Sequence, residues 1–266
     1  MIIGISGKLN SGKDVVADII MYLQFLKDNP SFEKTLTFEQ WQRQKETLPN
    51  IWEVKRFADK LKDIVCMLIG CTRTQLEDRN FKEKELDENW WVYELDEPDG
   101  MLVPYLGDDS NWLRENNIEP QKLTPRRILQ LLGTEAGRGV IHPDIWVNSL
   151  ISGYETNKSK WLVPDCRFHN EGDVIPRNGG IVIRVNRPLW FRFPELWDTL
   201  IGGGAKDCEE SFLEKLKECN FEMYNKLTHP SETSLDNYNG FTATLENDGS
   251  IEDLIEKVTK VVEPII

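Results

Sequence analysis

The chain has 266 residues, enough for one large domain or for a core with a subdomain. With 39% hydrophobic and 29% charged residues, its composition excludes the disordered and fibrous classes. Because 45 acidic residues stand against 32 basic ones, a net charge of −13, a uniformly basic surface for nucleic-acid backbones is excluded. An anionic ligand must therefore be held by a local cluster of cations.

Neither a membrane anchor nor a metal centre is indicated. No run approaches the roughly 18 apolar residues of a membrane span, and the N-terminus lacks the basic flank and cleavage site of a signal peptide. We expect a cytoplasmic protein without a membrane partner. The five cysteines form no CxxC pair and the three histidines have no metal-ligand spacing, so we expect reduced, structural cysteines.

The first elements form a strand, a glycine loop and a helix. Residues 2–6 are apolar and β-branched, as in a buried strand, and residues 7–13 follow as a loop. Apolar residues at helical spacing then continue to Asp28, before Pro30 ends the pattern.

The middle of the chain has a less regular pattern. We predict a surface excursion with a short helix over residues 31–52, a strand over 52–57, and a helix over 58–69 that ends at Gly70. Residues 89–106 are typical of a β-hairpin around the acidic turn 96–100.

The second half returns to alternating strands and helices. Thr124 and Pro125 are typical of a helix start, and this helix is expected to run to Gly133. Another helix is predicted from His142 onward. The remaining predicted elements are strands at 161–163, 181–185 and 242–245 and helices at 209–224 and 251–262. Strands separated by helices predict an α/β fold with a mainly parallel sheet.

The loop after the first strand carries the most specific motif. Gly7, Gly12 and Lys13 have the spacing of a Walker A phosphate loop. Glycines let the backbone turn tightly and direct amide groups at phosphates, and the following helix N-terminus adds partial positive charge. Lys13 is predicted to bridge the β- and γ-phosphates of a nucleotide.

Asp14 departs from this motif, in which Ser or Thr normally ligates Mg²⁺. A carboxylate here either holds the ion, directly or through water, or serves another role, with the Ser11 hydroxyl nearby. In the alternative interpretation, Asp14 has no ligand and is only an acidic residue that favours the first turn of a helix.

Asp165 follows an apolar strand, at the edge where open α/β sheets bind ligands. It is either a carboxylate for Mg²⁺ or substrate, or a cap of the next turn. Arg167 either reaches a phosphate or pairs with Asp165.

A second cluster of candidates lies on the helix after Thr124. Arg126 and Arg127 oppose the helix dipole in its first turn, which indicates an anion nearby, although at least one of them can simply be solvated. Trp146 is either a core residue or a platform for a base.

Together these segments resemble the phage deoxynucleoside monophosphate kinases, a branch of the P-loop nucleoside monophosphate kinase fold. Four blocks carry the resemblance: residues 5–7 with 11–14 and 17–18; 126–135; 163–167 with Glu171; and 229–232 followed by 247–250. The ending Gly12-Lys13-Asp14 is itself shared with that family.

The resemblance implies ATP-dependent phosphorylation of a deoxynucleoside 5′-monophosphate, with ATP and Mg²⁺ as cofactors. It implies that ATP is bound by Asn10, Ser11, Gly12, Lys13, Asp14, Arg187 and Asn247. It implies that the monophosphate is bound by Leu61, Lys62, Arg127, Gly133, Thr134, Trp146, Asp165, Arg167, Glu171 and Ser231. Lys13, Lys62, Arg127, Asp165 and Arg167 are the implied catalytic set, Lys60 competes with Lys62, and Asp14 is the implied metal ligand.

The implied organisation is one P-loop kinase domain over residues 1–266, with a monophosphate-binding insert over about 31–123 and a lid-like insert over about 188–228. The implied partners are small nucleotides without nucleic acid, the sequence leaves a homodimer open, and a phage-encoded protein would act in the cytoplasm of an infected bacterium. A P-loop kinase of another small acceptor and a non-catalytic nucleotide-binding module are the alternatives.

Overall fold

The computed structural model describes residues 1–94, 102–104, 120–202 and 208–266. The chain divides into two compact units. The first, here called the core unit, comprises Met1–Phe57 and Leu150–Ile266, and the second, the inserted unit, comprises Ala58–Ser149. The predicted assignment of residues 31–123 to monophosphate binding stays a prediction.

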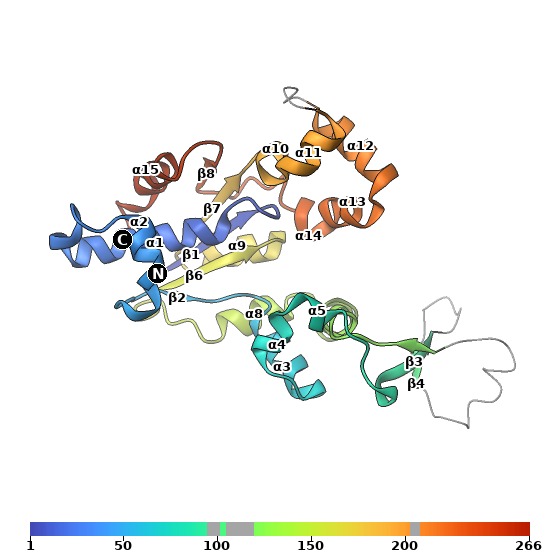
Figure 1. Cartoon of the computed structure of the whole chain (residues 1–266). Coiled ribbons are helices and arrows are strands. Elements are labelled where there is room, and N and C mark those ends of the chain that lie inside the picture. Colours follow the sequence, from blue (N-terminus) through green and yellow to red (C-terminus); the bar gives the residue numbers. More distant parts are fainter. Residues whose placement is uncertain (95–101, 105–119, 203–207) are drawn as a thin grey trace, which may run out of the picture. The chain divides into compact units, whose positions relative to one another are not determined.

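A parallel five-stranded sheet forms the centre of the core unit (Figure 1). Its strands, in spatial order, are β2 (Glu53–Val54), β6 (Trp161–Cys166), β1 (Ile2–Gly7), β7 (Ile181–Asn186) and β8 (Ala243–Glu246). Each parallel pairing requires a crossover connection, and helices supply these connections. The predicted α/β fold with a mainly parallel sheet flanked by helices is confirmed.

Alternate residues of β1 face the two sides of this sheet. Ile3 and Ile5 are fully buried in a cluster with residues of α1 (Lys13–Asp28) and α15 (Ile251–Val262). Gly4 faces the other side, where a Cβ would lie only 3.2 Å from Ile175 of α9 (His169–Arg177). The β1 strand is therefore buried on both faces, as its continuous apolar sequence predicts.

The segment between α1 and β2 contains three short helices. The excursion after α1 contains the predicted short helix, α2, which begins at a capping box of Thr37 and Gln40. The elements here are η1 (Pro30–Phe32), α2 (Phe38–Gln44) and η2 (Lys45–Thr47).

The segment between β7 and β8 is helical and has its own apolar core, formed by Leu189, Trp197, Phe212, Leu216 and Leu227. Its helices are α10 (Leu189–Arg192), α11 (Pro194–Leu200), α12 (Glu209–Cys219), α13 (Phe221–Thr228) and α14 (Pro230–Thr233). Of the three consecutive glycines at 202–204 in this segment, Gly203 and Gly204 lie outside the described residues.

The prediction of one helix over residues 209–224 is wrong. Two helices occur, and they are separated at Asn220, whose backbone is not helical. The Asn220 side chain accepts a hydrogen bond from the amide of Met223 and caps α13. Asparagine competes with the helical backbone in this way, and the periodicity of the apolar residues does not reveal it.

The inserted unit combines short helices with a small antiparallel sheet of order β4-β3-β5. Its elements are α3 (Asp59–Ile69), α4 (Arg73–Glu77), α5 (Arg79–Lys82), η3 (Glu88–Trp90), β3 (Trp91–Glu94), β4 (Leu102–Pro104), β5 (Gln121–Lys122), α7 (Pro125–Gln130) and η5 (Leu131–Ile141), followed by α8 (Ile145–Ile151). The antiparallel pairing of β3 with β4 confirms the hairpin. Its predicted turn, and residues 105–106, lie outside the described residues.

The helix predicted to end at Gly133 continues instead. After α7 it becomes the π-helix η5, which runs to Ile141. The carbonyl oxygen of Gly133 accepts a hydrogen bond from the indole nitrogen of Trp146 at 2.8 Å, so a side chain satisfies a backbone group in this stretch.

Two expectations from composition can be compared with the described residues. No helix among them is both long and apolar enough to cross a membrane. All five cysteines are free thiols, as expected, and Cys66 and Cys71 have their Sγ atoms 3.7 Å apart.

Candidate functional site

The glycine loop between β1 and α1 has the backbone geometry of an anion-binding site. Asn10 and Gly12 have left-handed φ values of 60° and 94°. A Cβ at Gly7 would lie 2.7 Å from the carbonyl oxygen of Val185 on the neighbouring strand, so only glycine fits there. The loop then enters α1 at Lys13, where the free amide groups of a helix N-terminus favour an anion.

Lys13 is held against this loop. Its side chain is buried, with the residue only 8% exposed, and its ammonium group donates to the carbonyl oxygen of Lys8 at 3.1 Å. Burial lowers the pKa of Lys13, and the nearby guanidinium of Arg167 lowers it further. A buried cation with a single carbonyl partner is poorly compensated, so an anion bound at the loop would stabilise it.

Asn247 and Ser11 are two further polar residues at the loop. Asn247, in the connection between β8 and α15, is buried and donates from its side-chain amide to the carbonyl oxygen of Ser11 at 2.9 Å. It therefore braces the loop. The Ser11 hydroxyl is buried and has no hydrogen-bond partner among the residues that the structure describes.

The helical segment between β7 and β8 contacts the amide, the carbonyl oxygen and the side chain of Leu9 in the loop. Its amide donates to the Glu232 carboxylate at 2.5 Å, and its carbonyl oxygen accepts from Arg192 Nε at 2.7 Å. Its side chain packs against the apolar core of that segment. Arg192 is 8% exposed, and the Asn10 side chain donates to its carbonyl oxygen.

Arg192 is a residue that the sequence analysis missed. It lies between Phe191 and Phe193 on a short helix, and its only signal is a charged residue in an otherwise apolar run. Glu232 was included in the resemblance but received no role there.

The carboxyl end of β6 gathers the acidic candidates. Asp165 accepts a hydrogen bond from the amide of Phe57 at 3.3 Å. Asp165 is half-buried as a residue, and protein groups surround its carboxylate. This burial, together with the nearby carboxylate of Glu171, raises the pKa of Asp165 to about 7, against the weaker opposite effect of Arg167.

Glu171 is buried and serves as a cap in this structure. Its carboxylate accepts from the amides of Arg167 and Phe168 at 2.8 and 3.2 Å, at the N-terminus of α9. The Arg167 side chain forms an ion pair with Glu232 at 2.7 Å and lies 3.5 Å from the Ser231 hydroxyl. Arg167 therefore hydrogen-bonds to Glu232 and not to Asp165, which decides against one of its two predicted roles.

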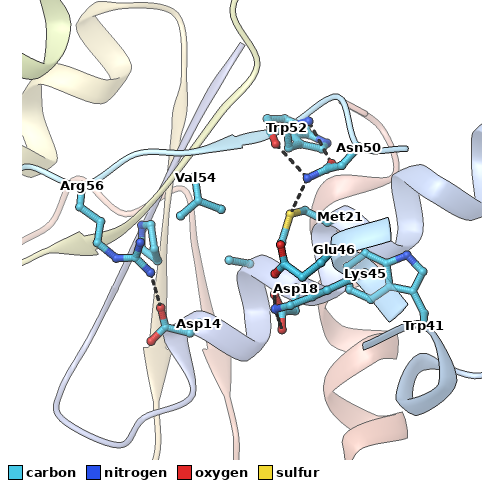
Figure 2. Close-up of a pocket in the computed structure, with 12 residues that line it drawn as sticks. Asp14, Asp18, Met21, Trp41, Lys45, Glu46, Asn50, Trp52, Val54 and Arg56 are labelled. Atoms are coloured by element: carbon cyan, nitrogen blue, oxygen red, sulfur yellow. Dashed lines mark hydrogen bonds and ion pairs between the residues drawn. The ribbon is translucent and has the colours of Figure 1, made fainter. Parts of the chain in front are cut away.

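Asp14 is largely exposed, with 24% of its side chain covered, and forms an ion pair with Arg56 at 3.2 Å. Figure 2 shows this pair at one end of a cavity of about 380 Å³. The ion pair of Lys45 with Asp18 also lines this cavity, together with Trp41 and Trp52.

Arg187 lines a separate cavity of about 250 Å³ with Lys8, Arg192 and Glu209. Its guanidinium lies 5.8 Å from the centre of the Phe191 ring, and its Nε atom is buried without a hydrogen-bond partner among the described residues. This cavity combines several cations with the aromatic side chain of Trp190.

The remaining candidates belong to the inserted unit. Lys62 forms an ion pair with Glu77 at 2.7 Å, and Arg127 forms one with Glu135 at 2.7 Å. Arg126 is paired with Glu83. The anions near both arginines are therefore exposed carboxylates of the protein itself.

Leu61, Gly133 and Trp146 lie together within the inserted unit. A Cβ at Gly133 would lie 2.8 Å from a methyl group of Leu61, and Trp146 is 5% exposed. Thr134 is exposed. Trp146 is thus a core residue here, one of the two roles predicted for it.

The predicted site residues therefore fall into two groups. The core unit holds Asn10, Ser11, Gly12, Lys13, Asp14, Asp165, Arg167, Glu171, Arg187, Ser231 and Asn247. The inserted unit holds Leu61, Lys62, Arg127, Gly133, Thr134 and Trp146.

Known proteins similar to this chain include two viral kinases, although no family model matches it. A curated protein of Escherichia phage T5, named deoxynucleoside-5′-monophosphate kinase, is 23% identical over 66% of this chain and 71% of its own length. A protein of Acanthamoeba polyphaga mimivirus, named putative deoxynucleotide monophosphate kinase, is 25% identical over 53% of this chain and 62% of its own length. The predicted resemblance is confirmed.

A solved structure also aligns with the whole chain. The crystal structure of TT1252 from Thermus thermophilus covers 100% of this chain and 98% of its own, with 16% identity and a TM-score of 0.34.

Proposed function

We propose that this protein is a nucleotide kinase that transfers the γ-phosphoryl group of ATP to a deoxynucleoside 5′-monophosphate. The phosphate loop with its buried Lys13 is the observation that carries the proposal. The names of the phage and mimivirus relatives support the same chemistry.

On the donor side, the amide groups of the loop and Lys13 would bind the ATP phosphates. Asn247 would keep the loop in shape through its hydrogen bond to Ser11. Arg187 has a buried Nε atom that lacks a partner among the described residues, which suits a role in binding ATP.

On the acceptor side, the resemblance assigns Lys62 and Arg127 of the inserted unit to the monophosphate. In the core unit it assigns Arg167 to the same ligand. Both Lys62 and Arg127 now pair with carboxylates that are about half exposed. Exposed ion pairs are weak, so a phosphate can replace either carboxylate at little cost. Asp165, Glu171 and Ser231 complete the implied polar set, with Leu61, Gly133, Thr134 and Trp146 shaping the nucleoside pocket.

The chemical step would need no covalent enzyme intermediate. An oxygen of the acceptor phosphate attacks the γ-phosphorus in line, and the bond to the ADP oxygen breaks. Lys13 and the arginines would hold the two anionic nucleotides together and stabilise charge on the transferred group.

Mg²⁺ fits the residues present at the loop, because the Asp14 carboxylate and the unpartnered Ser11 hydroxyl are hard oxygen donors. Among the described residues, no group of three or more His, Cys, Asp or Glu is arranged to hold a metal. We therefore assign Mg²⁺ chiefly to the nucleotide phosphates, with Asp14 as its protein ligand. When bound, it would neutralise phosphate charge.

A coupled assay of ADP release, with ATP and Mg²⁺ against each deoxynucleoside monophosphate, tests the proposal. We expect turnover that depends on the acceptor and is lost in Lys13→Met. Turnover only with another class of acceptor would contradict the substrate assignment. ATP binding without turnover with any acceptor would indicate a nucleotide-binding module and overturn the kinase.

A further inference from the structure

Glu232 is a buried carboxylate that connects two parts of the proposed site. It lies on the short helix α14, and only 5% of its side chain is exposed. One oxygen accepts from the amide of Leu9 in the phosphate loop, and the other accepts from the Arg167 guanidinium at 2.7 Å. Both oxygens are therefore occupied by donors.

This arrangement needs a carboxylate and not merely a polar side chain. Both partners are hydrogen-bond donors, so the connecting group must present two acceptors. Glutamine has nearly the same shape but only one acceptor, since its other terminal atom is a donor. Replacing Glu232 by glutamine must break the bond to Leu9 or the bond to Arg167.

Arg167 keeps part of its guanidinium available. Its side chain is 36% exposed, and only its NH1 group hydrogen-bonds to described residues, namely Glu232 and Ser231. A guanidinium has five N–H donors, so the Nε and NH2 groups remain for a ligand. Lys13 lies close enough to Arg167 for the two charges to interact.

We propose that Glu232 is a positioning residue for the phosphoryl transfer: it ties Arg167 to the Leu9 amide of the phosphate loop, so that the free edge of the guanidinium is presented beside Lys13. This inference rests on the proposed function, because it assigns Arg167 to the reacting phosphates. A buried carboxylate repels incoming phosphates, so its presence here is explained by the orientation that it gives to Arg167.

A double-mutant cycle between Glu232 and Arg167 tests the tie. We expect Arg167→Met to lower kcat/KM roughly 100-fold and Glu232→Gln to lower it roughly 10-fold, because a misoriented group loses much of its effect. If Glu232 acts through Arg167, the double variant should be no worse than Arg167→Met alone. Effects that multiply to about 1,000-fold, or an unchanged Glu232→Gln, would overturn the proposal.

Asp173→Asn is the matched control. Asp173 also accepts from one neutral donor, the Tyr238 hydroxyl at 2.9 Å, and pairs with one arginine, Arg177 at 3.6 Å, but it lies on α9 outside the proposed machinery. We expect Asp173→Asn alone to stay within about twofold of the wild type in kcat/KM, and the combination with Arg167→Met to stay within about twofold of Arg167→Met alone.

The failure of this inference and the failure of the kinase proposal are distinguishable. If the wild type shows no acceptor-dependent turnover, the kinase proposal fails. The same four proteins are then titrated with tripolyphosphate by calorimetry. Non-additive changes in Kd would still support the tie between Glu232 and Arg167, and additive changes would overturn it.

Discussion

The core unit and the inserted unit hold their cations in different ways. In the core unit, Lys13 and Arg192 are buried and donate to backbone carbonyl oxygens of the phosphate loop. In the inserted unit, Lys62 and Arg127 pair with carboxylates that are half exposed. The core unit therefore buries these two cations when it folds, whereas the inserted unit holds its two cations in ion pairs with half-exposed carboxylates.

This difference has an energetic consequence. Burying a charge costs free energy, so a buried cation is already oriented and desolvated when an anion arrives. Exposed pairs cost little to form and little to break. We therefore expect changes to the buried cations of the core unit to affect the chemical step and changes to the cations of the inserted unit to affect binding of the acceptor.

The largest expected effect is that of Lys13→Met. We expect kcat to fall about 1,000-fold or more, since charge on the transferred phosphoryl group loses its main cation. Thermal unfolding should be unchanged or occur at a higher temperature, because burial lowers the pKa of Lys13 and the charged form is disfavoured in the folded protein. A large loss of stability would show instead that Lys13 mainly holds the loop together.

Lys62→Ala should raise KM for the acceptor, whereas Lys13→Met should lower kcat. Removing a charge-assisted contact to the monophosphate should lower kcat/KM for the acceptor roughly 10- to 100-fold, mainly through KM. The free energy of unfolding should change by about 1 kcal/mol or less, because the Glu77 carboxylate of this ion pair is half exposed.

Lys82→Ala is the control for this variant, since Lys82 also pairs with Glu77, at 3.6 Å, and is buried to a similar extent. Steady-state kinetics on both variants show whether the loss of activity is specific to Lys62. Equal loss of activity in Lys82→Ala would mean that charge near Glu77 matters and that Lys62 has no particular role.

Asn247→Ala probes the brace of the phosphate loop. Losing a buried hydrogen bond to the Ser11 carbonyl oxygen should lower the free energy of unfolding by about 1 to 2 kcal/mol. The looser loop should raise KM for ATP up to about tenfold. Denaturant unfolding and ATP titration measure both effects, with Glu256→Gln, which removes an exposed ion pair on α15, as the control.

The last expected effect is a pH dependence of stability from Asp165, which is measured without an assay of activity. Its folded pKa of about 7 lies above the ordinary value of 3.8, so the folded protein binds the extra proton between these values. Stability from this group is fully present below about pH 4 and is lost as pH rises through 7.

Asp165→Asn removes this dependence. Because Asp165 is partly accessible to solvent, we expect the variant to be more stable than the wild type by only about 1 to 2 kcal/mol at pH 8, and equally stable near pH 4. Thermal melts at the two pH values measure this difference. A constant difference at both values would mean that Asp165 is ionised throughout.

Much of the fold follows from local sequence patterns. The β1 strand, the loop and α1 are contiguous, and their apolar periodicity and glycines act within a few residues of one another. The parallel sheet follows because strands that alternate with helices need long crossovers. The break at Asn220 was missed because the capping competes locally with a strong apolar period.

Lys13 and Asp165 could be identified as candidates from the sequence because of the glycine loop and the strand end that precede them. Lys62 was identified only through the family resemblance. The contacts that each of these side chains makes could not be predicted from the sequence. The sequence by itself determined the phosphate loop and the order of strands and helices around it.

Only the tertiary structure decided that Leu9 is held by Arg192 and Glu232, and that Asp165 has a pKa of about 7. Leu9 lies 183 and 223 residues from Arg192 and Glu232 in the chain, and Phe57, whose amide contacts Asp165, lies 108 residues from it. Hydrogen bonding and desolvation act over a few ångströms in space, and a linear pattern does not record which distant segments come within that range.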